Sequence, residues 1–129
     1  MTEIKKILVA DDEENIISFL KGFMSFFPNY SPKFFSNGKD LNEELEKGPE
    51  GLALVLTDKD MPYITGLKII NDYAKKQGYE EIPFLLMSGG QEVNKIRQEA
   101  IHAGAYDFIP KPFNLFDLKN TLQKALGFL

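Results

Sequence analysis

The chain has 129 residues, a net charge of −4 and an isoelectric point near 5.0, and 43% of its residues are hydrophobic. This length and composition predict one ordered domain over residues 1–129, without the basic surface with which nucleic-acid-binding domains neutralise phosphates. The absence of cysteine excludes disulfides and thiol chemistry, and the single histidine excludes a multi-histidine metal site.

No apolar run approaches the roughly 20 residues that span a bilayer. The segment from Met1 to Lys6 lacks the apolar stretch of a secretory signal. The sequence contains no internal repeat, low-complexity tract or linker-like segment. We therefore expect a cytoplasmic protein that makes no contact with a membrane.

Short apolar runs alternate with segments of helical periodicity along the whole chain. Pro28 ends the first helix, and Pro32 places the second strand at a sheet edge, because proline cannot donate to a central ladder. In chain order, the expected elements are a strand at 7–10, a helix from 14 to about 27, a strand at 30–35, a helix from Gly38 to before Gly48, a strand at 52–57, a helix from a Thr65 N-cap to near Gly78, a strand at 82–87, a helix at 91–102, a strand at 105–109 and a helix that follows Lys111-Pro112 and ends near Leu126.

Five strands that alternate with five helices predict an α/β fold. Because the strands are apolar almost throughout, we expect a parallel sheet covered by helices on both faces. In such sheets ligands bind beyond the carboxyl ends of the strands, where the strand order reverses. Functional residues are therefore expected directly after the first, third, fourth and fifth strands.

Polar residues occupy all four of these positions. Asp11 and Asp12 follow the first strand, Asp58 closes the third, Ser88 closes the fourth and Lys111 closes the fifth. Three neighbouring carboxylates repel one another unless a cation lies among them, and a set of oxygen ligands suits Mg²⁺. The alternative for the acidic pair is that it caps the first helix, where negative charge is favourable.

Four segments of the sequence resemble the receiver domains of response regulators in two-component signal transduction. They are Ile7–Glu13, Asp58–Gly66, Ile82–Gly89 and Ala103–Phe113, which include the patterns D-x-x-M-P-x-x-x-G and A-G-A-x-D-[FY]-x-x-K-P-[FL]. The resemblance covers nearly the whole chain. It implies a chemotaxis-regulator-like, flavodoxin-like fold, with a doubly wound five-stranded sheet in the order 2-1-3-4-5.

The resemblance implies that Asp58 accepts a phosphoryl group from a histidine kinase or a histidine phosphotransfer protein. Mg²⁺ or Mn²⁺ would be held by the carboxylates of Asp11, Asp12 and Asp58 and by the backbone carbonyl of Asp60. Lys111 would neutralise charge on the phosphoryl oxygens as the bond forms. The protein would then be a switch that modifies itself, not a conventional turnover enzyme.

The same resemblance implies an allosteric response. The Ser88 hydroxyl would bind a phosphoryl oxygen, and Phe108 would swing inward behind it; the alternative for Phe108 is an ordinary core residue. The peptide bond between Lys111 and Pro112 is expected to be cis and to aim the lysine into the site. The alternative is a trans bond at the start of the last helix, where proline is common.

Three residues near the acceptor carry further expectations. Gly66 is expected to end the acceptor loop in a backbone conformation that side chains resist, and Gly89 to leave room beside the phosphoryl group. The carboxylate of Asp60 is expected to tune metal affinity or the lifetime of the acyl phosphate.

Several aromatic residues fall outside the buried helix faces. Phe19 and Phe26 lie off the apolar stripe of the first helix, and Phe116 and Phe128 lie off that of the last. The latter pair is a candidate partner surface.

Expected partners are the phosphodonor protein, a downstream protein or fused output domain, and a second copy in a possible homodimer, but no nucleic acid. Because the chain stops soon after the fifth helix, it is expected to be a stand-alone receiver or the first domain of a longer protein. One alternative function is a phosphorylation-independent binding scaffold, although intact Asp58 and Lys111 favour the switch. The other is a haloacid-dehalogenase-like phosphohydrolase with Asp60 as the acid, for which the chain lacks substrate-covering insertions.

Overall fold

A five-stranded parallel sheet with the strand order β2-β1-β3-β4-β5 forms the centre of the protein. The computed structural model describes residues 4–128, so residues 1–3 and 129 of the predicted domain lie outside the described residues. The strands are β1 (Lys5–Ala10), β2 (Tyr30–Phe35), β3 (Leu52–Asp58), β4 (Phe84–Ser88) and β5 (Asp107–Pro110). The predicted strand order and the edge position of the strand that contains Pro32 are both confirmed.

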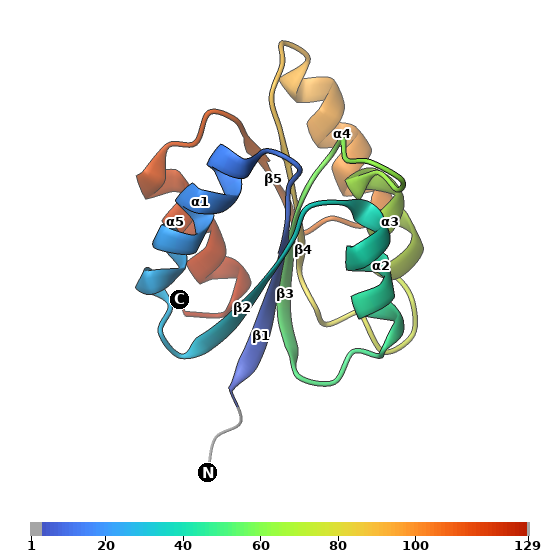
Figure 1. The fold of residues 1–129 in the computed structure, drawn as a ribbon. Helices are drawn as coiled ribbons and strands as arrows, with labels where there is room; N and C mark the ends of the chain where they lie inside the picture. Colours follow the sequence, from blue (N-terminus) through green and yellow to red (C-terminus); the bar gives the residue numbers. More distant parts are fainter. Residues whose placement is uncertain (1–3, 129) are drawn as a thin grey trace.

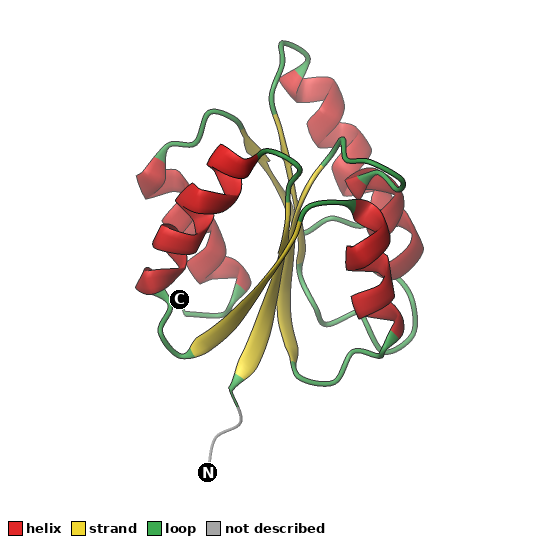
Figure 2. Cartoon of the chain, viewed as in Figure 1, coloured by secondary structure: helices red, strands yellow, loops and turns green. Residues whose placement is uncertain are grey.

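Helices cover both faces of the sheet, as predicted (Figure 1). They are α1 (Glu14–Phe23), α2 (Gly38–Glu46), α3 (Gly66–Tyr73), α4 (Val93–Ala103) and α5 (Leu115–Ala125). Figure 2 shows the resulting three layers, with α1 and α5 on one side of the strands and α2, α3 and α4 on the other. No helix in the part of the chain that the structure describes is long and apolar enough to cross a membrane.

Most residues of the inner strands β1, β3 and β4 are apolar and buried because both faces of these strands pack against helices. Alternate residues of a strand enter different cores: Leu8 and Val55 face α2–α4, whereas Val9 and Leu56 face α1 and α5. All four of these side chains are fully buried. Shortening such a buried leucine to alanine costs about 2–5 kcal/mol. Packing of this strength on both faces fixes the strands relative to one another and therefore fixes the positions of their carboxyl ends.

The ends of two helices differ from the expected boundaries. The first helix becomes a short 3₁₀ helix at Met24–Phe26. The third helix ends at Tyr73 and not near Gly78, because successive turns carry the chain from Tyr73 to Ile82 through bonds from Lys76 N to Tyr73 O and from Ile82 N to Tyr79 O. Local periodicity does not reveal these turns.

β4, β5 and α5 also begin later than the sequence predicts. Pro83 has no N–H, so it precedes β4 and only accepts a bond from Val55 N. Ala105 N–H donates back to Ala100 O at the end of α4, which delays β5. Asn114 caps α5 by accepting from Asp117 N, so this helix begins after the cap and not at Pro112.

Candidate functional site

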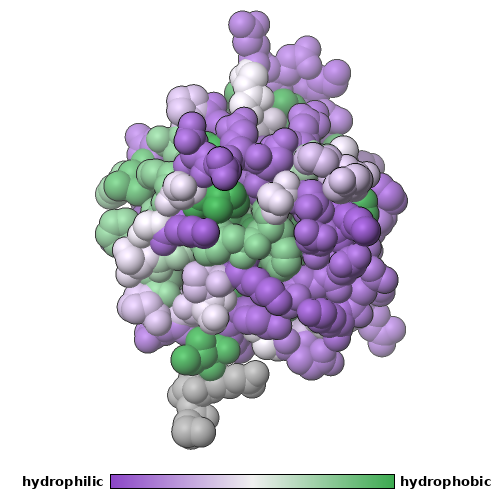
Figure 3. All heavy atoms as spheres, in the orientation of Figure 1, coloured by the Kyte–Doolittle hydropathy of each residue, from purple (hydrophilic) through white to green (hydrophobic). Residues whose placement is uncertain are grey.

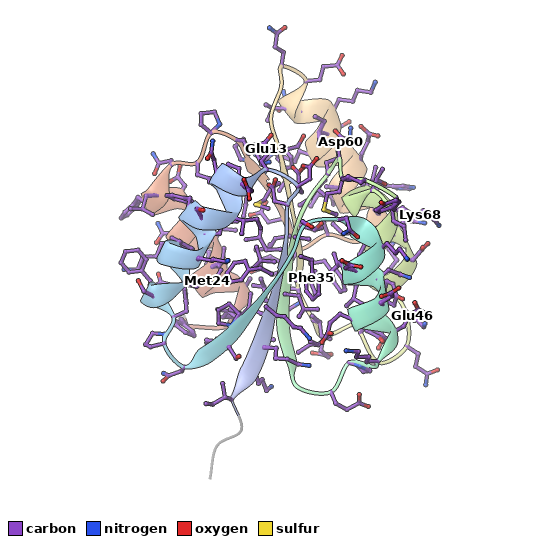
Figure 4. All side chains as sticks on the ribbon, viewed as in Figure 1. Glu13, Met24, Phe35, Glu46, Asp60 and Lys68 are labelled. Carbon is purple, nitrogen blue, oxygen red and sulfur yellow. The ribbon has the colours of Figure 1, made fainter. Side chains whose placement is uncertain are left out.

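The carboxyl ends of β1, β3, β4 and β5 meet at one rim of the sheet. The strand registers place Thr57 beside Ala10, Met87 beside Asp58 and Pro110 beside Ser88. An open cavity of about 530 Å³ lies at this rim. The predicted site residues that line it are Asp12, Asp58, Asp60, Ser88, Gly89, Lys111 and Pro112. Figure 4 shows Glu13 and Asp60, which also line the cavity, at the same end of the molecule.

Three carboxylates converge at this rim. Asp11 is fully buried, Asp58 is 7% exposed and Asp12 is exposed, and one oxygen from each lies within 4.8 Å of the others. Their elements explain the arrangement, because Asp11 and Asp12 directly follow β1 while Asp58 is the last residue of the adjacent strand β3. The convergence that the sequence predicts is therefore present in the structure.

Lys111 is the cation that faces these acids. Its Nζ lies 2.7 Å from Asp11 Oδ2 and 2.9 Å from Asp58 Oδ1, and its side chain is only 12% exposed. Burial lowers the pKa of Lys111, but the hydrogen bonds to Asp11 and Asp58 outweigh that effect and leave the pKa above its ordinary value. The lysine therefore stays charged, and one positive charge faces three carboxylates.

Asp58 is a destabilised carboxylate. Burial raises the pKa of Asp58 to about 6, the hydrogen bond from Lys111 opposes the rise, and the charges of Asp11 and Asp12 add to it. A carboxylate whose charge is incompletely compensated gains from any further positive charge that enters the cavity. Above pH 6 it is predominantly ionised, so it is available as a nucleophile at neutral pH.

The acidic pair does not cap α1. The N-cap position is Glu13, which makes no side-chain cap bond. Asp11 Oδ1 instead accepts the Glu13 N–H at 2.9 Å, one residue before the helix, and its other oxygen contacts Lys111. The capping alternative is therefore wrong, because Asp11 organises the turn that leaves β1 and Asp12 is free to face the cavity.

The segment after β5 is fixed to β4 beside the cavity. Lys111 N–H donates to Ser88 O at 2.8 Å, and Ser88 Oγ donates to Gly89 O at 3.2 Å. The peptide bond between Lys111 and Pro112 is cis, as predicted. Because α5 begins at Leu115, the alternative in which Pro112 opens that helix is wrong.

The structural reason for Gly66 differs from expectation, whereas the role of Gly89 stays a prediction. Gly66 is the first residue of α3 and does not have a left-handed φ, so the predicted reason for it is wrong. A Cβ there would overlap the carbonyl oxygen of Asp58, so glycine is required because α3 closely approaches the end of β3. A Cβ on Gly89 would make only ordinary contact with Lys111 Cβ at 3.8 Å. The left-handed φ, +106°, belongs to Gly90.

Phe108 is buried, and its neighbours include a residue that sequence reasoning missed. It is 3% exposed and packs in the core under α2–α4. The Arg97 guanidinium lies 5.3 Å from the Phe108 ring centroid, and Arg97 Nη1 lies 3.3 Å from Asp107 Oδ1. Arg97 is exposed on α4, so periodicity assigns it to the solvent face and gives no sign of this contact.

The loop between β3 and α3 contains Tyr63, a second residue that the sequence does not single out. Tyr63 has a φ of +72°, the only left-handed residue other than glycine among those described, and it is 81% exposed. Left-handed conformations are unfavourable for a side chain as large as tyrosine. This loop, which follows Asp58, therefore holds an exposed aromatic ring at a conformational cost.

Comparison with known proteins identifies the family to which the chain is similar. Residues 7–123 match the response regulator receiver domain. The chain is 33% identical over 121 residues to the 3′,5′-cyclic-nucleotide phosphodiesterase regA of Dictyostelium discoideum, an alignment that covers 94% of this chain and 15% of regA. It is 27% identical over 123 residues to the chemotaxis protein CheY homolog of Campylobacter jejuni, covering 95% of this chain and 92% of that protein.

Solved structures share the fold. The chemotaxis response regulator CheY4 of Vibrio cholerae aligns with a TM-score of 0.81 and 23% identity, over 96% of this chain and all of that chain. A chain from the co-crystal structure of the Saccharomyces cerevisiae histidine phosphotransfer protein Ypd1 and the receiver domain of the response regulator Ssk1 aligns with a TM-score of 0.78 and 18% identity. That alignment covers 96% of this chain and 90% of the other. At these identities the likeness extends to the fold.

Proposed function

The chain belongs to the response regulator receiver domain family, and on this basis we propose that it accepts a phosphoryl group on Asp58 and switches conformation to control a partner or an output domain. Receiver domains are signalling switches and not conventional enzymes. The observation that carries the proposal is the setting of Asp58, which opens into the rim cavity, lies 2.9 Å from Lys111 Nζ and has a raised pKa.

The proposed chemistry is the transfer of a phosphoryl group from a phosphohistidine. A carboxylate oxygen of Asp58 attacks phosphorus, the phosphorus–nitrogen bond breaks, and the imidazole leaves with the electron pair and takes a proton from solvent. The nucleophile and the phosphoryl group are both anionic, so positive charge must lie beside the equatorial oxygens. Lys111 supplies one such charge on a flexible stem, and the Ser88 hydroxyl and the amides after β4 are candidate donors.

The acidic residues at the rim fit the divalent cation of this family. Receiver domains bind Mg²⁺ at an acidic cluster, and here three carboxylate oxygens within 4.8 Å of one another face a single lysine. We propose that Asp11, Asp12 and Asp58 hold Mg²⁺ or Mn²⁺ through their carboxylates and Asp60 through its backbone carbonyl. When bound, the ion supplies further positive charge for the phosphoryl oxygens.

We propose that the switch uses Ser88 and Phe108. Ser88 Oγ donates to its neighbour Gly89 O at 3.2 Å, a long bond that the hydroxyl can exchange for a phosphoryl oxygen. Phe108 is already buried beneath Arg97, so phosphorylation would stabilise this inward position and shift an existing equilibrium. Gly89 would leave space beside the phosphoryl group.

The proposed upstream partner is a histidine kinase or a histidine phosphotransfer protein, as in the Ypd1–Ssk1 complex, and the proposed location is the cytoplasm. The chain spans 15% of regA and 92% of the Campylobacter CheY homolog, so relatives of this domain occur both within long proteins and nearly alone. We propose control of a downstream protein or a fused output domain, and homodimer formation is a further proposal.

Incubation of the protein with acetyl phosphate and Mg²⁺, followed by intact mass measurement, tests this function. We expect the mass to increase by one phosphoryl group, and we expect no increase in Asp58→Asn. An unmodified wild-type protein would favour the phosphorylation-independent scaffold. Continuous release of phosphate from a phosphomonoester would favour the phosphohydrolase alternative with Asp60 as its acid.

A further inference from the structure

The exposed aromatic residue Phe19 on α1 has an aromatic partner in the segment between β5 and α5. Phe19 lies off the buried stripe of the helix and is 41% exposed. Its ring stacks on the Phe113 ring with 5.7 Å between centroids and an interplanar angle of 24°, and it also stacks on Phe23 at 6.2 Å and 15°. Figure 3 shows that hydrophobic residues gather on this α1–α5 side, whereas the α2–α3 side is mostly hydrophilic.

Phe113 belongs to the short segment that carries the site lysine. It lies two residues after Lys111, directly before the α5 cap Asn114, and is partly buried against the core beneath α1 and α5. The segment is held at its start by the bond from Lys111 N to Ser88 O. At the other end of this segment, the Phe113 ring packs on Phe19.

The stack therefore joins the two segments on which the site depends. α1 begins at Glu14, two residues after Asp12, and Lys111 bonds to Asp11 at 2.7 Å. The Phe19–Phe113 contact is a second connection between α1 and the lysine segment. Aromatic pairs at such centroid separations are attractive beyond the area they bury. Because the lysine stem is flexible, the place of its Nζ depends on how firmly its backbone is held.

We propose that Phe19 is a positioning residue for the phosphoryl transfer, acting through Phe113 on Lys111. Its ring holds the segment after β5 against α1, so that Lys111 Nζ stays between Asp11 and Asp58, where the incoming phosphoryl oxygens need a positive charge. The inference rests on the proposed function. A displacement of about 1 Å of a group that neutralises transition-state charge can slow a reaction severely, so a modest surface contact can have a large kinetic effect.

The test is the rate constant for phosphorylation by acetyl phosphate at saturating Mg²⁺. This donor is too small to use a protein-docking surface, so its rate reports positioning within the chain. We expect Phe19→Ala and Phe19→Leu to react roughly tenfold more slowly, and Phe19→Tyr, which keeps the ring, to react at nearly the wild-type rate. Phe19→Leu keeps apolar bulk and covers the case in which Phe19→Ala does not fold.

Phe26→Ala is the matched control. Phe26 is also aromatic and 47% exposed on the same side of the molecule, but it pairs with Phe23 and Lys119. We expect its rate to stay within about twofold of wild type, as for a surface change away from the site. Equal slowing in Phe26→Ala and Phe19→Leu would overturn the proposal, because the effect would then belong to the aromatic surface in general.

A double-mutant cycle with Lys111→Gln separates positioning from general loosening of the fold. If Phe19 acts through the lysine, Phe19→Leu adds no further slowing in the Lys111→Gln background. Full additivity of the two changes would overturn the proposal, and so would slowing seen only with a phosphorylated protein donor. If the wild-type protein is not phosphorylated at all, the proposed function fails and this inference fails with it.

Discussion

Asp58 and Glu44 are both buried carboxylates beside lysines, yet their environments shift their pKa values in opposite directions. Asp58 shares Lys111 with Asp11, and burial, the largest effect, raises the pKa of Asp58 to about 6. Glu44 on α2 is 5% exposed, and hydrogen bonds from lysines, that from Lys33 above all, lower its pKa to about 2. Its partners are Lys6, Lys33 and Lys47, at 3.3, 2.9 and 3.0 Å.

The difference lies in the local balance of charge. At Glu44 the cations outnumber the acid, so the group is satisfied by the chain itself and joins α2 to β1 and β2. At the rim the acids outnumber the cation, and the remaining negative charge can be satisfied only from outside. The first arrangement stabilises the fold, whereas the second lowers its stability and prepares a site for positively charged or charge-neutralising ligands.

The largest expected effect is that of the divalent ion. With Mg²⁺ at 100 times its dissociation constant, the free energy of unfolding should rise by about 2.7 kcal/mol, because the ion binds the folded carboxylate cluster. Urea denaturation with and without Mg²⁺ measures this gain. Asp12→Asn should lose most of it and Glu44→Gln should keep it. An equal gain in Asp12→Asn would contradict the cation site.

Removal of the Asp58 charge should stabilise the protein in metal-free buffer. Asp58→Asn is expected to raise the free energy of unfolding by about 2 kcal/mol at pH 8, since the folded state no longer holds a carboxylate whose pKa is raised from 3.8 to about 6. An acid with a raised pKa destabilises the fold when ionised. Wild type should therefore regain stability relative to the variant as pH falls from above 6 toward 3.8.

Denaturation curves for wild type and Asp58→Asn at pH 8 and at pH 4.5 check the sign of the stability difference and the pH range in which it changes. Glu44→Gln, measured in the same way, should not share this gain at pH 8. A destabilised Asp58→Asn would mean that the ion pair with Lys111 outweighs burial, and the contrast between the two carboxylates would disappear.

The opposite sign is expected at the lysine cluster. Glu44→Gln should lower the free energy of unfolding by about 1 kcal/mol at pH 7, a small value because its lysine partners are 39–68% exposed and their ion pairs are screened by water. Because the folded pKa is depressed from 4.5 to about 2, the contribution is present above pH 4.5 and is lost as pH falls toward 2.

Thermal or urea denaturation of wild type and Glu44→Gln at pH 7 and pH 3.5 follows this loss. Lys33→Met is a companion variant, because its bond to Glu44 makes the largest contribution to the depressed pKa. A constant gap between wild type and Glu44→Gln at both pH values would show that the lost stability comes from packing and not from charge.

The fold and the rim site were predictable because both are encoded locally. Apolar runs bounded by turn residues gave the order of the elements, and strands that end at Asp58 and Ser88 placed both side chains at the rim. Parallel topology then brings strand ends together whatever their separation in sequence. This explains why the meeting of Asp58 with Lys111 could be foreseen.

Features that depend on contacts across the fold were not predictable. The lysines around Glu44 come from β1, β2 and the end of α2, and each resembles an ordinary solvated residue in the sequence. Gly66 is the last residue of the D-x-x-M-P-x-x-x-G pattern. The steric requirement for glycine, the nearby carbonyl oxygen of Asp58, becomes visible only when α3 packs on β3. Phe19 lies off its helical stripe in the sequence, but nothing local indicates its partner Phe113 near the other end of the chain.

The smallest expected effect concerns Asp60, an exposed acid that lines the rim cavity outside the Asp11, Asp12 and Asp58 cluster. If excess negative charge recruits the cation, Asp60→Asn should weaken Mg²⁺ binding by about twofold, since an exposed charge acts through solvent and salt. Glu43→Gln, an exposed acid on α2, removes the same charge near Glu44 and should leave Mg²⁺ affinity unchanged. Mg²⁺ titrations and acyl-phosphate decay rates of both variants test this role. If Asp60→Asn matches wild type in both assays, the Asp60 side chain does not help to attract the cation, and that role falls to Asp11, Asp12 and Asp58.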